Sequence, residues 1–182
     1  MSSGDNRDYK ELLIGCGMDR AKRIQVKYPE WQHLTTMDRN PRCEPDLLHD
    51  LTEYPWPISD DSFDEIHGYE VCEHVTGRQG EEKPFFQFFS EAWRVLKPNG
   101  IFAGTVPRFD SIQAFGDPSH SRVINEVTLW FLSQQSYIEG VGSFAISDFR
   151  AIYRADFEIL ATTRMGDSLV FELKAMKPAR GA

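Results

Sequence analysis

The sequence predicts a doubly wound α/β domain whose sheet is mostly parallel and ends in a C-terminal antiparallel hairpin. The apolar run Leu12–Ile14 stops abruptly at Gly15 and Gly17, as a buried parallel strand does where it meets a tight loop. Apolar segments of strand length then alternate with segments of helical periodicity, which is typical of a parallel sheet covered by helices on both faces. Strand-like runs on both sides of Gly166-Asp167 indicate the hairpin.

The N-terminal part of the chain supplies the parallel strands and their helices. Ala21, Ile24 and Tyr28 recur at helical spacing before Pro29, which predicts a helix over 19–28. A further helix is predicted over 84–96, where apolar residues again recur at helical spacing and Pro84 suits a first helical turn. The expected parallel strands are Tyr9–Ile14, His33–Met37, Leu47–His49, Phe63–Gly68 and Ile101–Val106.

The stretch from Pro107 to Arg154 is different in character, because it is rich in aromatic residues and glycines and has little periodicity. One helix-like piece, Asn125–Leu132, interrupts it. Long insertions of this kind usually carry function or shape an entrance, so we expect 107–154 to act as a lid on a ligand site. The chain then closes with the expected hairpin strands Phe157–Thr163 and Leu169–Met176.

Composition indicates one ordinary globular domain. The 182 residues are 41% hydrophobic and 26% charged, and no apolar run is long enough to cross a bilayer. Met1–Asn6 contains no apolar core of a secretion signal, so a cytoplasmic location is expected. Cys16, Cys43 and Cys72 form no CxxC pair, which predicts reduced thiols. A net charge of −8 argues against a broad nucleic-acid-binding surface.

Candidate ligand-binding residues follow the first three strands. In an open α/β sheet a ligand lies at the carboxyl ends of the strands, which is where Gly15 and Gly17 fall. Asp38 ends the second strand, where a carboxylate can accept hydrogen bonds from both hydroxyls of a ribose. Asp50 follows the third strand, where it can accept a hydrogen bond from an adenine amino group. Together these residues predict a nucleoside-binding site.

With Arg94–Gly100 further along, these motifs resemble the class I S-adenosylmethionine (SAM)-dependent methyltransferases, in particular compact bacterial and phage-encoded members. The resemblance extends from about Tyr9 to Lys177 and implies a Rossmann-like fold with SAM as cofactor. The chain departs from the family pattern at Leu13, where many members carry an acid, and at Asp19, which replaces the usual third glycine. The cofactor-binding residues that we assign on this basis are Gly15, Cys16, Gly17, Asp38, Arg39, Asp50, Leu51 and Tyr69.

Methyl transfer from SAM depends mainly on orientation, and a general base is needed only when the acceptor carries a proton. The catalytic candidates are Glu70 and His74 after the fourth strand and His120 in the insertion. If Glu70 opened a helix, its spacing to Glu73 and His74 would place all three on one face. A divalent metal held by these three residues therefore stays open as an alternative.

Two other functional classes share parts of this pattern. A dinucleotide-dependent oxidoreductase needs a third glycine where Arg20 stands, so pyrophosphate binding is disfavoured. A non-catalytic SAM-binding or interaction module on the same fold remains the alternative, given Leu13 and Asp19. No Asp/Asn-Pro-Pro-Tyr segment and no Pro-Cys pair is present, which disfavours nucleic-acid bases as acceptors. The expected acceptor is an oxygen or nitrogen of a small molecule or a protein.

Overall fold

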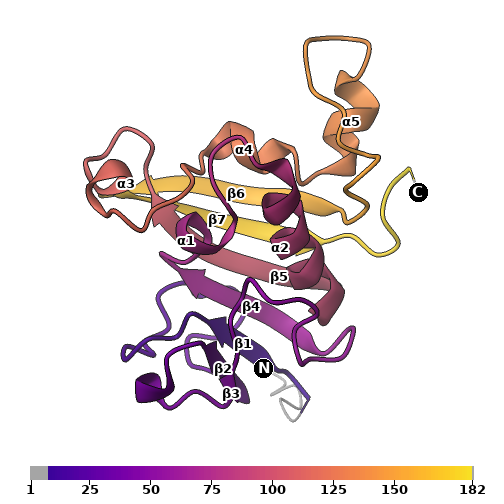
Figure 1. Cartoon of the computed structure of the whole chain (residues 1–182). Coiled ribbons are helices and arrows are strands. Elements are labelled where there is room, and N and C mark those ends of the chain that lie inside the picture. Colours follow the sequence, from indigo (N-terminus) through magenta and orange to yellow (C-terminus); the bar gives the residue numbers. More distant parts are fainter. Residues whose placement is uncertain (1–7, 182) are drawn as a thin grey trace.

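The computed structural model describes residues 8–181, and within them seven strands form a single sheet (Figure 1). The prediction about secretion made from Met1–Asn6 lies outside the described residues. The strands are β1 (Glu11–Ile14), β2 (Leu34–Asp38), β3 (Leu47–Leu48), β4 (Phe63–Tyr69), β5 (Leu96–Pro107), β6 (Phe157–Met165) and β7 (Ser168–Ala175). The helices are α1 (Cys72–Val75), α2 (Glu82–Val95), α3 (Gln113–Gly116), α4 (Glu126–Trp130) and α5 (Gln134–Gly140), with a 3₁₀ turn at η1 (Pro41–Cys43).

The strand order is β3-β2-β1-β4-β5-β7-β6, and it confirms the predicted doubly wound sheet. The five strands from β3 to β5 are parallel, whereas β7 pairs antiparallel with both β5 and β6. The predicted C-terminal hairpin is therefore confirmed, with its turn at Gly166, whose φ is +56°. The order reverses between β1 and β4, and in sheets of this type a ligand binds beside that reversal.

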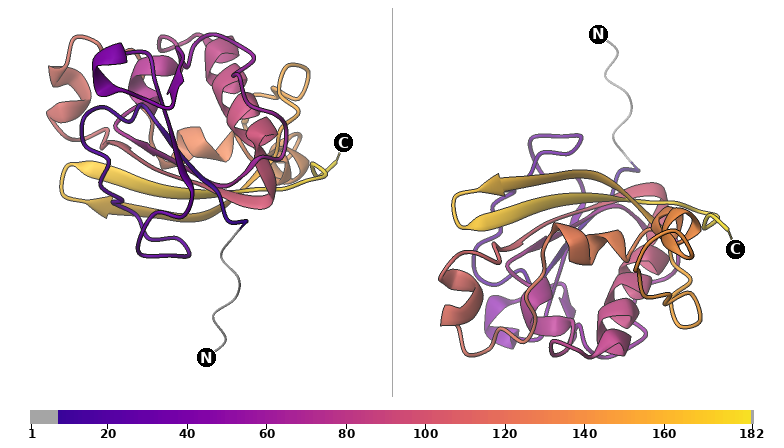
Figure 2. Two further views of the ribbon diagram at one scale, coloured as in Figure 1. Left: turned by 90° about the horizontal axis from the view of Figure 1, so that it is seen from below. Right: turned by 90° about the horizontal axis from the view of Figure 1, so that it is seen from above.

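The helix α2 covers one face of the sheet and forms the main core. Its buried Phe85, Phe88 and Phe89 lie on the inner side of the helix, as the helical spacing predicts. The ring centroid of Phe89 lies 5.9 Å from that of Phe102 on β5. The fully buried Leu12 and Ile14 of β1 belong to this same core. Figure 2 shows α1, α2 and α4 on this face.

An irregular segment, residues 15–33, covers part of the opposite face, and the helix predicted over 19–28 was wrong. In this segment, side chains form hydrogen bonds with backbone groups that would pair with one another in a helix. The Ala21 N–H donates to Asp19 Oδ1 at 2.9 Å, and the Trp31 indole donates to the Arg20 carbonyl at 2.6 Å. The hydroxyl of Tyr69 accepts from the N–H of Arg23 at 3.2 Å. The thin apolar stripe of this segment did not outweigh these contacts.

A buried polar cluster lies beneath the irregular segment. Glu11 on β1 pairs with Lys22, and Glu65 on β4 accepts hydrogen bonds from Tyr9 at 2.5 Å and from His67 at 2.7 Å. The hydrogen bonds of Glu65 outweigh the cost of its burial and lower its pKa below the ordinary value. Since every one of these side chains has a partner, the cluster fixes the segment to the sheet.

The insertion between β5 and β6 is more ordered than its sequence indicates. Besides the predicted helix, which appears as α4, it contains α3 and α5. Asn125 caps α4 by accepting from the Thr128 N–H at 2.9 Å. Asp156, at the end of the insertion, is fully buried and forms an ion pair with Arg180 at 2.7 Å. No helix within residues 8–181 has the length and apolarity needed to cross a membrane.

Candidate functional site

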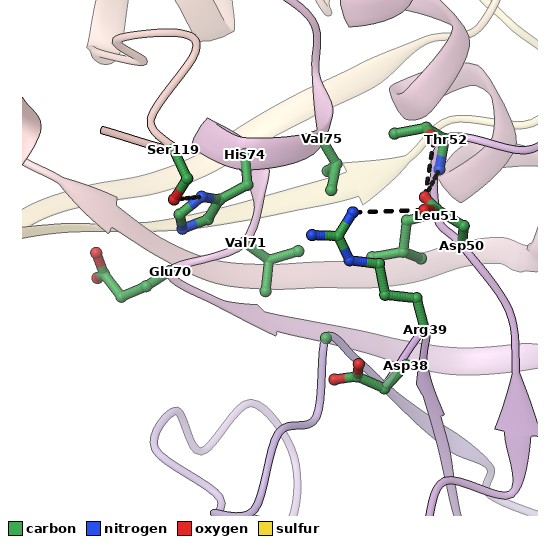
Figure 3. A pocket seen from close by; sticks show the side chains of 11 residues that line it. Asp38, Arg39, Asp50, Leu51, Thr52, Glu70, Val71, His74, Val75 and Ser119 are labelled. Atoms are coloured by element: carbon green, nitrogen blue, oxygen red, sulfur yellow. Dashed lines mark hydrogen bonds and ion pairs between the residues drawn. The ribbon is translucent and has the colours of Figure 1, made fainter. Parts of the chain in front are cut away.

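A cavity of about 350 Å³ opens at the carboxyl ends of β1, β2 and β4, next to the reversal in strand order (Figure 3). This volume lies within the roughly 300–1,000 Å³ of small-molecule sites. Its wall is formed by Gly15, Asp38, Arg39, Asp50, Leu51, Thr52, Glu70, Val71, His74, Val75 and Ser119. Seven residues predicted to serve the site are among them: Gly15, Asp38, Arg39, Asp50, Leu51, Glu70 and His74.

The turn after β1 brings backbone to the edge of the cavity. Gly15 and Gly17 both have positive φ, +56° and +53°. A Cβ on Gly15 would lie 2.5 Å from Cγ2 of Val71, whereas a Cβ on Gly17 would meet nothing within 4 Å. The first position therefore requires glycine for its conformation and for space, and the second for its conformation only.

Asp38 and Asp50 are held in fixed orientations by neighbouring backbone. Asp38 Oδ2 accepts from the Gly17 N–H at 2.9 Å, and its Oδ1 accepts from the Asn40 N–H at 2.8 Å. Asp50 Oδ1 accepts from the N–H and hydroxyl of Thr52, at 2.9 and 2.8 Å. Burial raises the pKa of Asp50, but the hydrogen bonds from Thr52 outweigh it and the net shift is downward. Each oxygen of Asp38 keeps a second lone pair for a ligand, whereas Asp50 can accept from a ligand through Oδ2, because Thr52 already fills both lone pairs of its Oδ1.

The cavity combines an apolar wall with an acidic rim. Leu51, Val71 and Val75 supply the apolar side chains, and Figure 3 shows Arg39 crossing from the β2 end toward Asp50. The Arg39 guanidinium lies 3.5 Å from Asp50 Oδ2 and is 77% exposed, so the pair adds little to stability. With Asp38 and Glu70 also on the wall, carboxylates outnumber cations and the cavity favours a cationic over an anionic ligand.

Three of the residues predicted at the cofactor do not line this cavity. Cys16 is buried behind the turn, and burial raises the pKa of its thiol. Gly17 contributes through its N–H to Asp38. Tyr69 lies on the opposite side of the sheet, where its hydroxyl accepts from the N–H groups of Arg23 and Ile24 and bonds His67 Nδ1 at 2.9 Å.

Glu70 leaves the strand in an unusual conformation. Its φ is +55°, uncommon for a residue with a side chain, and its N–H still donates to the Thr105 carbonyl at 2.9 Å. Its Oε1 accepts from the Ser168 hydroxyl at 2.9 Å. The helix α1 begins two residues later, at Cys72, so Glu70 does not open it and the condition for a shared face with Glu73 and His74 is not met. Figure 3 shows the Glu70 carboxylate directed away from His74.

A second group of titratable side chains lies behind His74. The His74 and His120 rings are in edge-to-face contact, with centroids 4.6 Å apart, so the structure brings together two predicted residues from distant segments. Glu73 is only 2% exposed, and neither carboxylate oxygen has a hydrogen-bond partner within the described chain. Burial, together with Glu70 and Asp117, raises the pKa of Glu73 to about 8.

The sequence analysis missed four residues of the cavity wall. Three of them, Thr52, Val71 and Val75, lie next to predicted residues in the sequence. The helix α1 beside Val71 and Val75 has only four residues, which is too short for a periodic pattern to predict it. Ser119 comes from the insertion, and its hydroxyl bonds His74 Nδ1 at 3.1 Å. Only the proximity of two segments 45 residues apart reveals that contact.

Comparison with known proteins identifies the family. A family model described as a methyltransferase domain matches residues 12–104, from β1 into β5, and this match includes the whole cavity wall except Ser119. The chain belongs to the class I SAM-dependent methyltransferases. A probable SAM-dependent methyltransferase of Mycolicibacterium smegmatis is 31% identical to this methyltransferase over 142 residues, covering 70% of the chain. The chain spans about half (51%) of the length of that curated relative.

Solved structures share the fold of this methyltransferase at low identity. The N-methyltransferase NodS of Bradyrhizobium japonicum, solved with S-adenosyl-L-homocysteine (SAH), is 13% identical, with a TM-score of 0.57 over 92% of this chain and 78% of that one. A SAM-dependent methyltransferase of Archaeoglobus fulgidus is 15% identical, with a TM-score of 0.57 over 91% and 86%. A putative methyltransferase of Haloferax volcanii, solved with the Trm112 activator, reaches 0.58 at 13% identity over 93% and 84%.

SAM is the cofactor of this methyltransferase, and the cavity fits its chemistry. Asp38 and Asp50 offer acceptors for hydroxyl and amino donors, and the apolar wall suits a purine ring. The acidic rim suits a sulfonium and disfavours a pyrophosphate. Moreover, residues 15–33 contain no helix after β1, so the glycine turn lacks the helix N-terminus that binds phosphate in dinucleotide sites.

Proposed function

We propose that this methyltransferase transfers the methyl group of SAM to an oxygen or nitrogen of a small molecule or a protein, with the cavity after β1, β2 and β4 as the cofactor site. The acidic and apolar composition of that cavity, at the reversal in strand order, is the observation that carries the proposal. The relative from Mycolicibacterium smegmatis is likewise a probable SAM-dependent methyltransferase.

Each part of the cavity has a role in the proposed binding mode. Asp38 accepts hydrogen bonds from the ribose hydroxyls, while the Gly17 N–H keeps its carboxylate in position. Asp50, fixed by Thr52, accepts from the adenine amino group, and Leu51 with Val71 forms the apolar surface beneath the ring. In this binding mode Cys16 and Tyr69 do not touch the cofactor. Cys16 supports the turn after β1, and Tyr69 holds the irregular segment in place.

The bound cofactor supplies a methyl group that is already activated on a sulfonium. The chain's contribution is to orient the acceptor and to exclude water, which together can account for roughly 7–11 kcal/mol of the barrier. Glu70 is the proton acceptor that we place first, because its carboxylate lies on the cavity wall and Ser168 holds it. Strained backbone at such a position is common in functional sites. His74 and His120 remain further candidates, although His74 Nε2 lies 3.8 Å from Glu73, behind the cavity.

The insertion is proposed as the lid of this site. Its Ser119 already contributes to the cavity wall and bonds His74. The N–H groups of Ser121 and Arg122 donate to the Glu73 carbonyl at 3.0 and 3.2 Å, so the base of the insertion is fixed to α1. Segments farther from this attachment are therefore the ones expected to close over the cofactor.

Turnover with methyl-labelled SAM tests the proposed activity. The protein is incubated with the separated small-molecule and protein fractions of a bacterial extract, and labelled product and SAH are measured. We expect labelled product from the wild type, strong reduction in Asp38→Ala and Glu70→Gln, and no change in Asp60→Ala, whose 72% exposed side chain pairs with Arg94 outside the cavity. Tight SAM binding without product in either fraction would instead favour the non-catalytic binding module.

A further inference from the structure

The cluster of Glu73, His74 and His120 lies behind the cavity wall and joins α1 to the insertion. Nε2 of His74 lies 3.8 Å from Glu73 Oε1, and Nε2 of His120 lies 3.9 Å from the same oxygen. One donor atom from each residue can be chosen so that all three lie within 4.8 Å of one another. The donors therefore converge, but they are too far apart for direct hydrogen bonds.

The buried carboxylate of Glu73 is the independent sign that something binds there. Both of its oxygens are buried without a hydrogen-bond partner in the described chain. Unsatisfied buried polar groups are rare and costly in native proteins, more so for a carboxylate. A second three-residue cluster, Glu11, Glu65 and His67, shows the contrast, because Lys22, Tyr9 and Tyr69 satisfy its members.

The tautomer of His74 is set by a chain of hydrogen bonds. Ser119 Oγ lies 2.6 Å from Asp117 Oδ1, to which it donates, and 3.1 Å from His74 Nδ1. With its proton given to Asp117, the hydroxyl accepts from Nδ1–H, which leaves the Nε2 lone pair free on the side of Glu73. Metal-ligating histidines are commonly oriented in this way by a hydrogen bond from their other ring nitrogen.

We propose that Glu73, His74 and His120 bind a divalent first-row transition metal ion, with Zn²⁺ as the best match. Two imidazoles and one carboxylate favour this class over Mg²⁺ and Ca²⁺, which prefer oxygen ligands. Ligand bonds of about 2.0–2.2 Å let one ion bridge donors 3.8–3.9 Å apart with only a small movement. The ion ties the insertion to α1, and Glu70 remains the proton acceptor on the other side of His74.

The metal site does not depend on the proposed acceptor, so its test uses binding rather than turnover. The chelator-treated protein, residues 1–182, is titrated with Zn²⁺ by calorimetry, and with Co²⁺ while the visible spectrum is recorded. We expect one ion per chain, visible Co²⁺ bands and a raised melting temperature. Glu73→Gln should abolish this binding, and Ser119→Ala should weaken it by about 10- to 100-fold, because it removes the hydrogen bond that orients His74.

The controls separate this site from adventitious binding. His33→Asn removes an exposed histidine elsewhere and should leave the Zn²⁺ affinity unchanged. The melting curve of each metal-free variant shows whether it folds. If Glu73→Gln does not fold, Ser119→Ala still tests the proposal, because it changes an exposed residue. No binding by the wild type, or equal affinity and Co²⁺ spectra in the wild type and both cluster variants, would overturn the proposal.

Discussion

Gly15 and Gly17 stand on the same turn, yet the structure makes different demands on them. We expect Gly15→Ala to lower the free energy of unfolding by about 2–5 kcal/mol, because it combines positive φ with a Cβ 2.5 Å from Val71. Gly17→Ala meets open space and should cost only the conformational part, about 1–2 kcal/mol. Chemical denaturation of both variants measures the difference, and equal losses would show that the contact with Val71 relaxes freely.

At the scale of single residues, the sequence predicted which residues line the cavity better than it predicted the backbone conformation of Glu70. Gly15, Asp38 and Asp50 follow strands, and the parallel sheet carries every strand end to one edge, so sequence position alone brought them together. The shared face of Glu70, Glu73 and His74 depended on a helix that opens at Glu70, and α1 begins only at Cys72. Glu70 instead adopts a left-handed conformation, which no sequence pattern with a glutamate indicates.

Among the larger elements, residues 15–33 depend on the hydroxyl of Tyr69. We expect Tyr69→Phe to leave the N–H groups of Arg23 and Ile24 without their acceptor, at a cost of about 1–3 kcal/mol. Hydrogen exchange at those two amides should become faster while SAH affinity stays nearly unchanged. A large loss of SAH affinity with unaltered stability would mean that Tyr69 contacts the cofactor directly, as the family resemblance implies.

The insertion is the other element whose behaviour the account predicts. If 107–154 closes over the cofactor, saturating SAH should slow hydrogen exchange in α3 and its flanking loops. Residues 119–122 should change less, because hydrogen bonds already fix them to α1. Exchange in the hairpin of β6 and β7 serves as the internal control. Unchanged exchange throughout the insertion at saturating SAH would contradict the proposed lid.

The strength of the helical periodicity decided which elements could be predicted from the sequence. The strongly periodic 84–96 segment, with its phenylalanines on one side, formed α2 as predicted, and Gly166 marked the hairpin. The 19–28 segment had a weaker stripe, and its Arg23 and Ile24 N–H groups donate to the hydroxyl of Tyr69, a residue more than 40 positions away in the sequence. Long-range side-chain contacts of this kind override local propensity.

For the molecule as a whole, the mostly parallel sheet with its terminal hairpin was predictable, and the covering of its second face was not. Strands alternating with helical periodicity predicted the parallel sheet, and the order confirms it. One face is covered by helices, whereas the irregular 15–33 segment covers part of the other (Figure 2). Because of this arrangement the glycine turn has no helix N-terminus beside it, which favours a nucleoside without phosphates as the ligand.

The choice of cofactor is the central claim, and calorimetric titration of the wild type with SAH and with NAD tests it most directly. We predict that SAH binds and NAD does not, that Asp38→Ala weakens SAH binding by about 1–3 kcal/mol, and that Asp60→Ala does not weaken it. Binding of NAD at least as tight as that of SAH, or equal SAH affinity in the wild type and Asp38→Ala, would contradict the account.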